Sequence, residues 1–351
     1  MSTDRPLRLG VVGAGRAVRE LHVPALRHLR RQVRVVGVAS RTVEGAEALC
    51  RELARQGLGG AVAAPTVQHL LDDQRVDAVL VAPPIALTAG ITERALRAGK
   101  HVLAEKPLAE SVERAVELWR LAREHDVVLA VGENFRFQPD YRRVRDLVDS
   151  GRIGTPYLYF LNDLHFTSPD SAHAAAPWRR SGAHRGGYLV DGGVHIVAGM
   201  RSLVNRAVTH VHGLSAAVHP EYLSGQPDTL LLNLRFSQGL IGHLALGYGA
   251  FDVESRHPKI YGDRGTLVLM PEAIELWQEP GRQQVAPRSH DQGFDAEWAA
   301  FLAAVRGEAE WEPLVRDAVV DLAVVLAGVL SARRGDVVAL EELLRGAGVP
   351  P

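Results

Sequence analysis

Cysteine, lysine and any excess of one charge are scarce in this 351-residue chain. The one cysteine, Cys50, excludes an intrachain disulfide and a zinc site built from cysteines, and it suits a reducing compartment. The 40 basic and 41 acidic residues leave a net charge of −1, which argues against nucleic acid or an anionic membrane as a partner. No apolar run approaches the ~18 residues of a membrane span, and the polar N-terminus lacks the pattern of a signal peptide. These features predict a cytoplasmic globular protein.

Lysine occurs at three positions, Lys100, Lys106 and Lys259, because nearly all other basic residues are arginine. A lysine kept in such a chain is a mild indication that the ammonium group matters there. Composition alone does not separate the three.

The first third of the chain alternates apolar runs with helical patterns. Apolar runs predict strands at 7–12, 33–39, 78–82, 101–104 and 127–131, and helices are predicted between them at 44–56, 91–98 and 112–124. This alternation predicts βαβ units and a parallel sheet. Runs without polar alternation are typical of strands that are buried on both faces.

The pattern changes after about residue 132. A helix is predicted at 141–150 and the C-terminal helices at 295–306 and 314–334, with strands between them at 157–162, 208–217, 229–236, 240–248, 259–261, 266–269 and 274–278. Consecutive strands at hairpin spacing predict a largely antiparallel sheet. The chain therefore reads as an α/β protein with a dinucleotide-binding domain at 1–132 and an α+β domain at 133–351, C-terminal helices included.

A glycine-bearing turn, "GAGRAV" at 13–18, follows the first predicted strand. Gly13 would allow a tight turn, and Gly15 would let the backbone approach a pyrophosphate at the following helix. Arg16 and Ala17 complete the candidate cofactor residues at this turn. The third glycine of the fingerprint is replaced by Val18, so an ordinary strand–helix turn is the alternative.

The second predicted strand ends on Ser40-Arg41-Thr42, where a carboxylate that binds the adenosine ribose of NAD is usual. The guanidinium of Arg41 and the hydroxyl of Ser40 suit a 2′-phosphate instead. This predicts NADP(H) in preference to NAD(H). The alternative is that Arg41 is a solvated loop residue.

The segment "ALRAGKHVLAEKPL" at 95–108 resembles the Gfo/Idh/MocA family of oxidoreductases. The segments "GRIGTP" at 151–156, "GGYLVDGGVH" at 186–195 and "YGDRGTL" at 261–267 resemble it too, so the resemblance covers nearly the whole chain. It implies a Rossmann domain, a second domain with an open-faced sheet, and a nicotinamide cofactor. Because members commonly associate through that sheet, it also implies a homodimer or homotetramer.

Three residues match the catalytic positions of the family: Lys106 in "EKP", and Asp191 and His195, which are four residues apart. Hydride transfer at carbon requires proton transfer at oxygen, and histidine titrates near neutrality. An ammonium such as that of Lys106 stabilises negative charge on that oxygen. Residues four apart share one helix face. The alternatives are a surface lysine, a helix-capping aspartate and an ordinary histidine.

The resemblance adds further candidates. Cofactor contacts are expected from Pro83, Thr88 and Glu105 together with Lys106, and substrate contacts from Arg136, Trp178 and Tyr188. Trp178 could instead be a packing aromatic, and Tyr188 could face the core. Relatives often have a histidine at the position of Thr88, and an acidic residue at that of Ala198. Pro107 matches a proline that often follows a bent or cis peptide.

Histidines and aspartates gather between residues 163 and 184, but their spacing matches no ligand motif, so no metal is expected. The favoured function is an NADP-dependent oxidoreductase that interconverts a secondary alcohol and a ketone on a sugar, cyclitol or related polyhydroxylated molecule. One alternative is a glycosidase-like enzyme that retains NAD and uses transient oxidation. Another is a non-catalytic ligand sensor, although sensors usually lose Lys106, Asp191 and His195.

Overall fold

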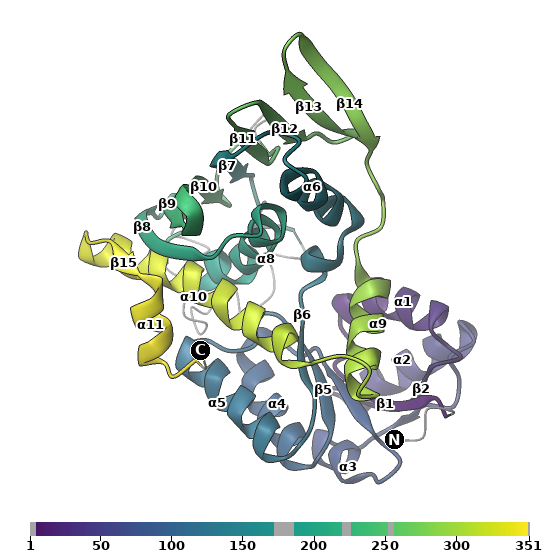
Figure 1. Ribbon diagram of the computed structural model, residues 1–351. Helices are drawn as coiled ribbons and strands as arrows, with labels where there is room; N and C mark the ends of the chain where they lie inside the picture. The colour runs from purple at the N-terminus through teal and green to yellow at the C-terminus, as the bar shows by residue number, and fades with distance from the viewer. Residues whose placement is uncertain (1–4, 172–185, 220–225, 252–255, 350–351) are drawn as a thin grey trace. The chain divides into compact units, whose positions relative to one another are not determined.

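The structure is a computed structural model that describes residues 5–171, 186–219, 226–251 and 256–349 (Figure 1). The chain forms two compact units. The first comprises Met1–Glu133 and Gly293–Val319, and the second comprises Asn134–Gln292 and Val320–Pro351. In the described part of the chain, no helix is both long and apolar enough to cross a membrane.

The first unit contains a six-stranded parallel sheet, which confirms the Rossmann prediction. Its order is β3 (Val62–Ala63), β2 (Val33–Ala39), β1 (Leu7–Val12), β4 (Ala78–Val81), β5 (His101–Glu105) and β6 (Leu129–Gly132). The strand order reverses between β1 and β4. In open α/β sheets, ligands bind outside the carboxyl ends of the strands at such a switch point.

Helices cover both faces of this sheet. One face buries residues of η1 (Ala17–His22), α1 (Val23–His28), α2 (Val43–Arg55) and α9 (Phe294–Val305) in a common core. The other carries α3 (Val67–Asp72), α4 (Thr88–Arg97) and α5 (Val112–Glu124). The hydroxyls of Thr42, Thr66 and Ser111 cap α2, α3 and α5 by accepting a backbone N–H three residues on.

The segment Gly293–Val319 differs from the sequence prediction, which assigned every C-terminal helix to the second domain. Trp298 and Phe301 of α9 are fully buried in the core of the first unit, against α1. Helix α9 has apolar residues nearly all round its axis, so its periodicity did not show which sheet it would cover.

The second unit contains a nine-stranded sheet, largely antiparallel as predicted. Its order is β14 (Gly281–Pro287), β13 (Ala273–Gln278), β12 (Gly265–Leu269), β11 (Lys259–Gly262), β7 (Pro156–Leu164), β10 (Ile241–Gly247), β9 (Thr229–Phe236), β8 (Val208–Ala216) and β15 (Val338–Ala339). The β7–β10 pair is parallel and the other pairs are antiparallel.

Helices lie on one face of the nine-stranded sheet. Helix α8 (Gly187–Val204) packs against α6 (Pro139–Asp149) and β10, and the second half of α10 (Glu312–Arg334) lies on β8. The last approach is close, since a Cβ added to Gly213 would lie 2.2 Å from the carbonyl oxygen of Gly328. The chain ends in α11 (Leu340–Gly346).

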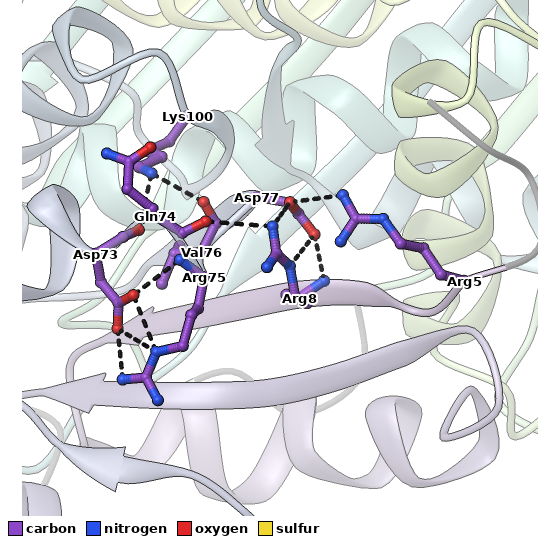
Figure 2. Close-up of polar contacts among 8 residues, drawn as sticks. All are labelled: Arg5, Arg8, Asp73, Gln74, Arg75, Val76, Asp77 and Lys100. Carbon is purple, nitrogen blue, oxygen red and sulfur yellow. Dashed lines mark hydrogen bonds and ion pairs between the residues drawn. The ribbon is translucent and has the colours of Figure 1, made fainter.

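The amino-terminal edge of the parallel sheet holds a cluster of charged residues (Figure 2). The buried Asp77 carboxylate accepts from the Arg8 guanidinium at 2.6 and 3.0 Å and from Arg5 at 3.2 Å. The buried Lys100 donates to the backbone carbonyls of Asp73 and Val76 at 3.0 and 2.9 Å. Burial lowers the pKa of Lys100. These two hydrogen bonds give Lys100 a structural role at this edge of the sheet.

Asp77→Asn is expected to destabilise the protein at neutral pH. Burial raises the pKa of Asp77, but the hydrogen bonds and charges of Arg8 and Arg5 outweigh burial and leave this pKa below its ordinary value of 3.8. A carboxyl whose folded-state pKa is lowered stabilises the fold above pH 3.8, and this contribution is lost as the pH falls through the folded-state pKa. The free energy of unfolding, measured with denaturant at pH 7, should fall by about 1–3 kcal/mol.

At pH 3 the difference in the free energy of unfolding between wild type and Asp77→Asn should be smaller than at pH 7. Asp72→Asn, which changes an exposed carboxylate on α3, serves as the control and should cost under about 0.5 kcal/mol. An equal loss at both pH values would contradict the assigned role of the Asp77 charge.

Candidate active site

Gly13 joins the ends of three strands at the switch point of the first sheet. Its N–H donates to the carbonyl of Ala39 at the end of β2, at 2.8 Å. Its φ is +110°, and an added Cβ would lie 2.2 Å from the carbonyl oxygen of Ala82, which follows β4. Both the backbone conformation and the space therefore require glycine here.

Gly15 is exposed, and an added Cβ would meet no heavy atom within 4 Å. The backbone of the turn is thus open to an approaching ligand at Gly15 and closed against the sheet at Gly13. This arrangement fits a dinucleotide pyrophosphate, which needs a tight turn with exposed backbone.

The helix after the turn begins at Ala17 as a π-helix and continues as α1. Val18, at the position of the missing third glycine, is buried in the core. Arg16 pairs with Glu20 through hydrogen bonds of 3.0 and 2.9 Å on the surface. Arg19, which belongs to no sequence motif, donates to the carbonyl of Ala14 at 3.0 Å and so stabilises the turn.

The end of β2 carries no carboxylate before Glu44, which lies in the first turn of α2. Ser40 is half-buried and Arg41 is exposed. The Ser40 hydroxyl lies near the start of α2, since a Cβ added to Gly45 would be 3.3 Å from its Oγ. A hydroxyl, a guanidinium and a helix N-terminus at one strand end are groups that suit a phosphate.

Pro83 follows β4 and is half-buried, whereas Thr88, the first residue of α4, is 2% exposed. Glu105 ends β5 and Lys106 follows directly. Both are half-buried, and the peptide bond between Lys106 and Pro107 is cis. Cofactor candidates thus occupy the carboxyl edges of β1, β2, β4 and β5 in one sheet.

In the second unit, Asp191 and His195 lie one turn apart on α8. Asp191 is 6% exposed and belongs to the body of the helix, so it is not the N-cap residue, which is Gly186. The His195 ring is half-buried and stacks on Phe135, with ring centroids 4.9 Å apart and an interplanar angle of 21°. The stacking restricts how the imidazole can turn about its side-chain bonds.

Tyr248, which follows β10, comes close to the same stretch of α8. A Cβ added to Gly192 would lie 1.9 Å from the Tyr248 hydroxyl. Burial raises the pKa of Tyr248, and the charges of Asp163 and Asp191 raise it further. The ring of Tyr188 tilts against that of Tyr248 at 5.4 Å, and the ring of His165 meets it edge-on at 4.9 Å. The sequence predicts the strand that ends near Tyr248, but no sequence pattern indicates the contact of this tyrosine with α8.

Arg136 lies in the short helix Asn134–Phe137 and forms an ion pair with the buried Asp321 of α10. Arg201 pairs with the same carboxylate at 2.6 Å. Trp178 lies outside the described residues. Within the described ranges, no group of three or more His, Cys, Asp or Glu side chains is placed to hold a metal ion.

Two family models match the chain. Residues 7–133 match an oxidoreductase family described by its NAD-binding Rossmann fold, and residues 145–340 match the C-terminal alpha/beta domain of that family. The 1,5-anhydro-D-fructose reductase of Ensifer adhaerens is 29% identical over 348 residues, covering 95% of this chain and 98% of that protein.

Solved structures of related sequence have a similar fold. An oxidoreductase from Thermotoga maritima superposes with a TM-score of 0.87 at 28% identity, covering 97% of this chain and 100% of that one. A 3-ketoreductase from Actinomadura kijaniata, in complex with NADP and TDP-benzene, gives 0.78 at 26% identity, covering 93% and 98%. The family matches together span most of the sequence, and the chain belongs to the Gfo/Idh/MocA family of oxidoreductases.

Proposed function

We propose that the protein is an NADP-dependent oxidoreductase that interconverts a secondary alcohol and a ketone on a sugar, cyclitol or related polyhydroxylated molecule. The observation that carries the reaction type is the pair Asp191 and His195, one turn apart on α8, in a family of oxidoreductases. The substrate class is supported by relatives named as an anhydrofructose reductase and a 3-ketoreductase.

The cofactor would be held at the carboxyl edge of the first sheet. Gly13 and Gly15 would receive the pyrophosphate, while Ser40 and Arg41 would bind the 2′-phosphate. When bound, the nicotinamide supplies or accepts a hydride. The preference for NADP(H) is supported by the lack of a carboxylate at the end of β2 and by the NADP found in the related 3-ketoreductase.

The protein's own side chains would handle the proton and the charge at the reacting oxygen. His195 would act as the acid or base, because an imidazole can exchange a proton near neutral pH. Lys106 would stabilise negative charge on the oxygen through its ammonium group. Asp191 would orient these two groups.

The proposal is tested by titrating the protein with NADPH and with NADH, followed by a panel of sugars, cyclitols and their keto forms. Tighter NADPH binding and turnover of one polyol–ketone pair are expected. A cofactor that stays bound through purification would favour the NAD-retaining glycosidase-like enzyme instead. Cofactor binding without turnover of any substrate would favour a ligand sensor.

We further propose that the protein forms a homodimer or homotetramer through the open face of the nine-stranded sheet. This face exposes four large apolar side chains, 39–56% accessible: Leu214, Leu231, Ile241 and Trp277. Leu214 and Leu231 are direct partners across β8 and β9. Sedimentation at micromolar concentration should therefore show a dimer or tetramer.

The double variant Leu231→Arg with Ile241→Arg should sediment as a folded monomer, because a buried, unpaired charge opposes association. Val62→Arg, at an exposed position on β3, is the matched control and should leave assembly unchanged. A monomeric wild-type protein would contradict the proposed assembly.

A further inference from the structure

His22 is a buried residue that the proposed mechanism does not use. It is the last residue of η1, is 0% exposed, and lies in the first unit. Its ring meets Phe294 and Trp298 of α9 edge-on, with centroids 5.6 and 5.9 Å away. Both ring nitrogens are nevertheless in hydrogen bonds, so the ring is held by polar contacts as well as by packing.

The two hydrogen bonds define the protonation of the ring. The Trp298 indole N–H donates to Nδ1 of His22 at 3.1 Å. An indole nitrogen can only donate, so Nδ1 must be the unprotonated acceptor. The proton of neutral His22 is therefore on Nε2, which donates to Oε1 of Glu105 at 2.7 Å. A doubly protonated imidazolium would place two N–H groups against each other at the indole.

Glu105 connects His22 to the candidate active site through this hydrogen bond. It ends β5 opposite Gly132 of β6, where an added Cβ would lie 3.7 Å from Oε1. Lys106 is the next residue in the chain. The hydrogen bond between His22 and the Glu105 carboxylate therefore restrains the end of β5 directly before the proposed catalytic lysine.

We infer that His22 is a positioning residue for Glu105 and Lys106, and that Trp298 of α9 fixes it as the neutral Nε2–H tautomer. The inference rests on the proposed function for its effect on turnover, but the tautomer is a property of the protein alone. Trp298 belongs to the segment Gly293–Val319 and lies 276 residues from His22 in the chain. The inference therefore gives this segment a role in positioning Glu105 and Lys106.

The first test is the tautomer. Long-range ¹H–¹⁵N correlation spectra of the ¹⁵N-labelled wild-type protein at pH 7 should show His22 protonated on Nε2 and not on Nδ1. Trp298→Phe keeps an aromatic ring but removes the donor, so Nδ1 can take up a proton while Nε2–H still donates to Glu105, and the doubly protonated imidazolium should become populated. Protonation of Nδ1 in the wild-type protein would overturn the inference, whatever the enzyme does.

The second test is turnover. His22→Leu should lower kcat about tenfold, as expected for the loss of one positioning hydrogen bond, with a smaller change in the Kd for NADPH, whose phosphates are proposed to bind at the glycine turn and the end of β2. His22→Gln retains an amide N–H near the position of Nε2 and should recover part of that loss. Trp298→Phe should lower kcat in the same direction, which keeps the test open if His22→Leu does not fold.

The matched control is His28, a histidine of the same region that pairs with a carboxylate on the surface. Its Nδ1 lies 2.7 Å from Asp295 of α9. His28→Leu should leave kcat unchanged. An equal loss in His28→Leu, or an unchanged kcat in a folded His22→Leu, would reduce His22 to a structural residue. If the wild-type protein turns over no substrate, the proposed function fails. The tautomer result would still decide which ring nitrogen of His22 donates and which accepts.

Discussion

Replacing His195 or Lys106 by alanine is expected to lower kcat by roughly 10²–10⁴-fold, the usual cost of removing a positioned acid or base. His195 is half-buried and its ring stacks on Phe135, which restricts the orientation of the imidazole. If both groups act only at the reacting oxygen, their loss should lower kcat far more than the affinity for NADPH, whereas a matching loss of affinity in Lys106→Ala would show that Lys106 acts as a cofactor contact. Steady-state kinetics with the substrate found in the panel, together with NADPH fluorescence titration, measure the two effects.

The double variant adds a sharper criterion. If Lys106 and His195 serve one proton transfer, the combined loss should be smaller than the product of the two single losses. His125→Ala, at the exposed end of α5, and Lys259→Ala, on β11, are the controls and should retain wild-type rates. Near wild-type turnover in His195→Ala would transfer the acid–base role to Lys106 or Tyr188. Wild-type turnover in both single variants would favour the ligand sensor.

Most strands of the first unit could be predicted because they are buried on both faces. The apolar runs 7–12 and 33–39 coincide with β1 and β2, since no polar alternation blurs their ends and a turn residue follows each. Helix α5 also begins and ends as predicted, because Ser111 caps it and its apolar face repeats with helical spacing.

Elements without such a pattern were missed. The strand β14, "GRQQVAP", is mostly exposed and carries neither an apolar run nor regular alternation, so only its pairing with β13 defines it. The π-helix at Ala17–His22 cannot be distinguished from an ordinary helix in the sequence, because its hydrogen-bond pattern leaves no mark on composition.

The site divides in the same way. Residues at strand ends, such as Gly13 and Arg41, could be placed from the sequence because a parallel sheet brings all carboxyl ends to one edge. The Trp298–His22–Glu105 chain could not, because its members are 83 and 276 residues apart and Trp298 reaches His22 only through the packing of α9 against α1. The contact of Tyr248 with Gly192 likewise depends on how α8 lies over β10.

Arg41→Ala is expected to weaken NADPH binding by roughly 10- to 100-fold and to leave NADH binding nearly unchanged. The two cofactors differ by the 2′-phosphate, and losing one charge-assisted hydrogen bond costs about 1.5–3 kcal/mol. Arg41 is exposed at the end of β2, so its loss should leave the fold intact. Fluorescence titration with both cofactors measures the discrimination directly.

Two further variants make the Arg41 result decisive. Arg51→Ala removes another exposed arginine, on α2, and should change neither affinity. Ser40→Asp places a carboxylate at the end of β2, where it should repel the 2′-phosphate and accept from the ribose hydroxyls of NADH. Ser40→Asp should therefore weaken NADPH and tighten NADH, reversing the preference when combined with Arg41→Ala. An equal loss of both cofactors in Arg41→Ala would show that the guanidinium does not read the phosphate, and the preference for NADP(H) would have to be abandoned.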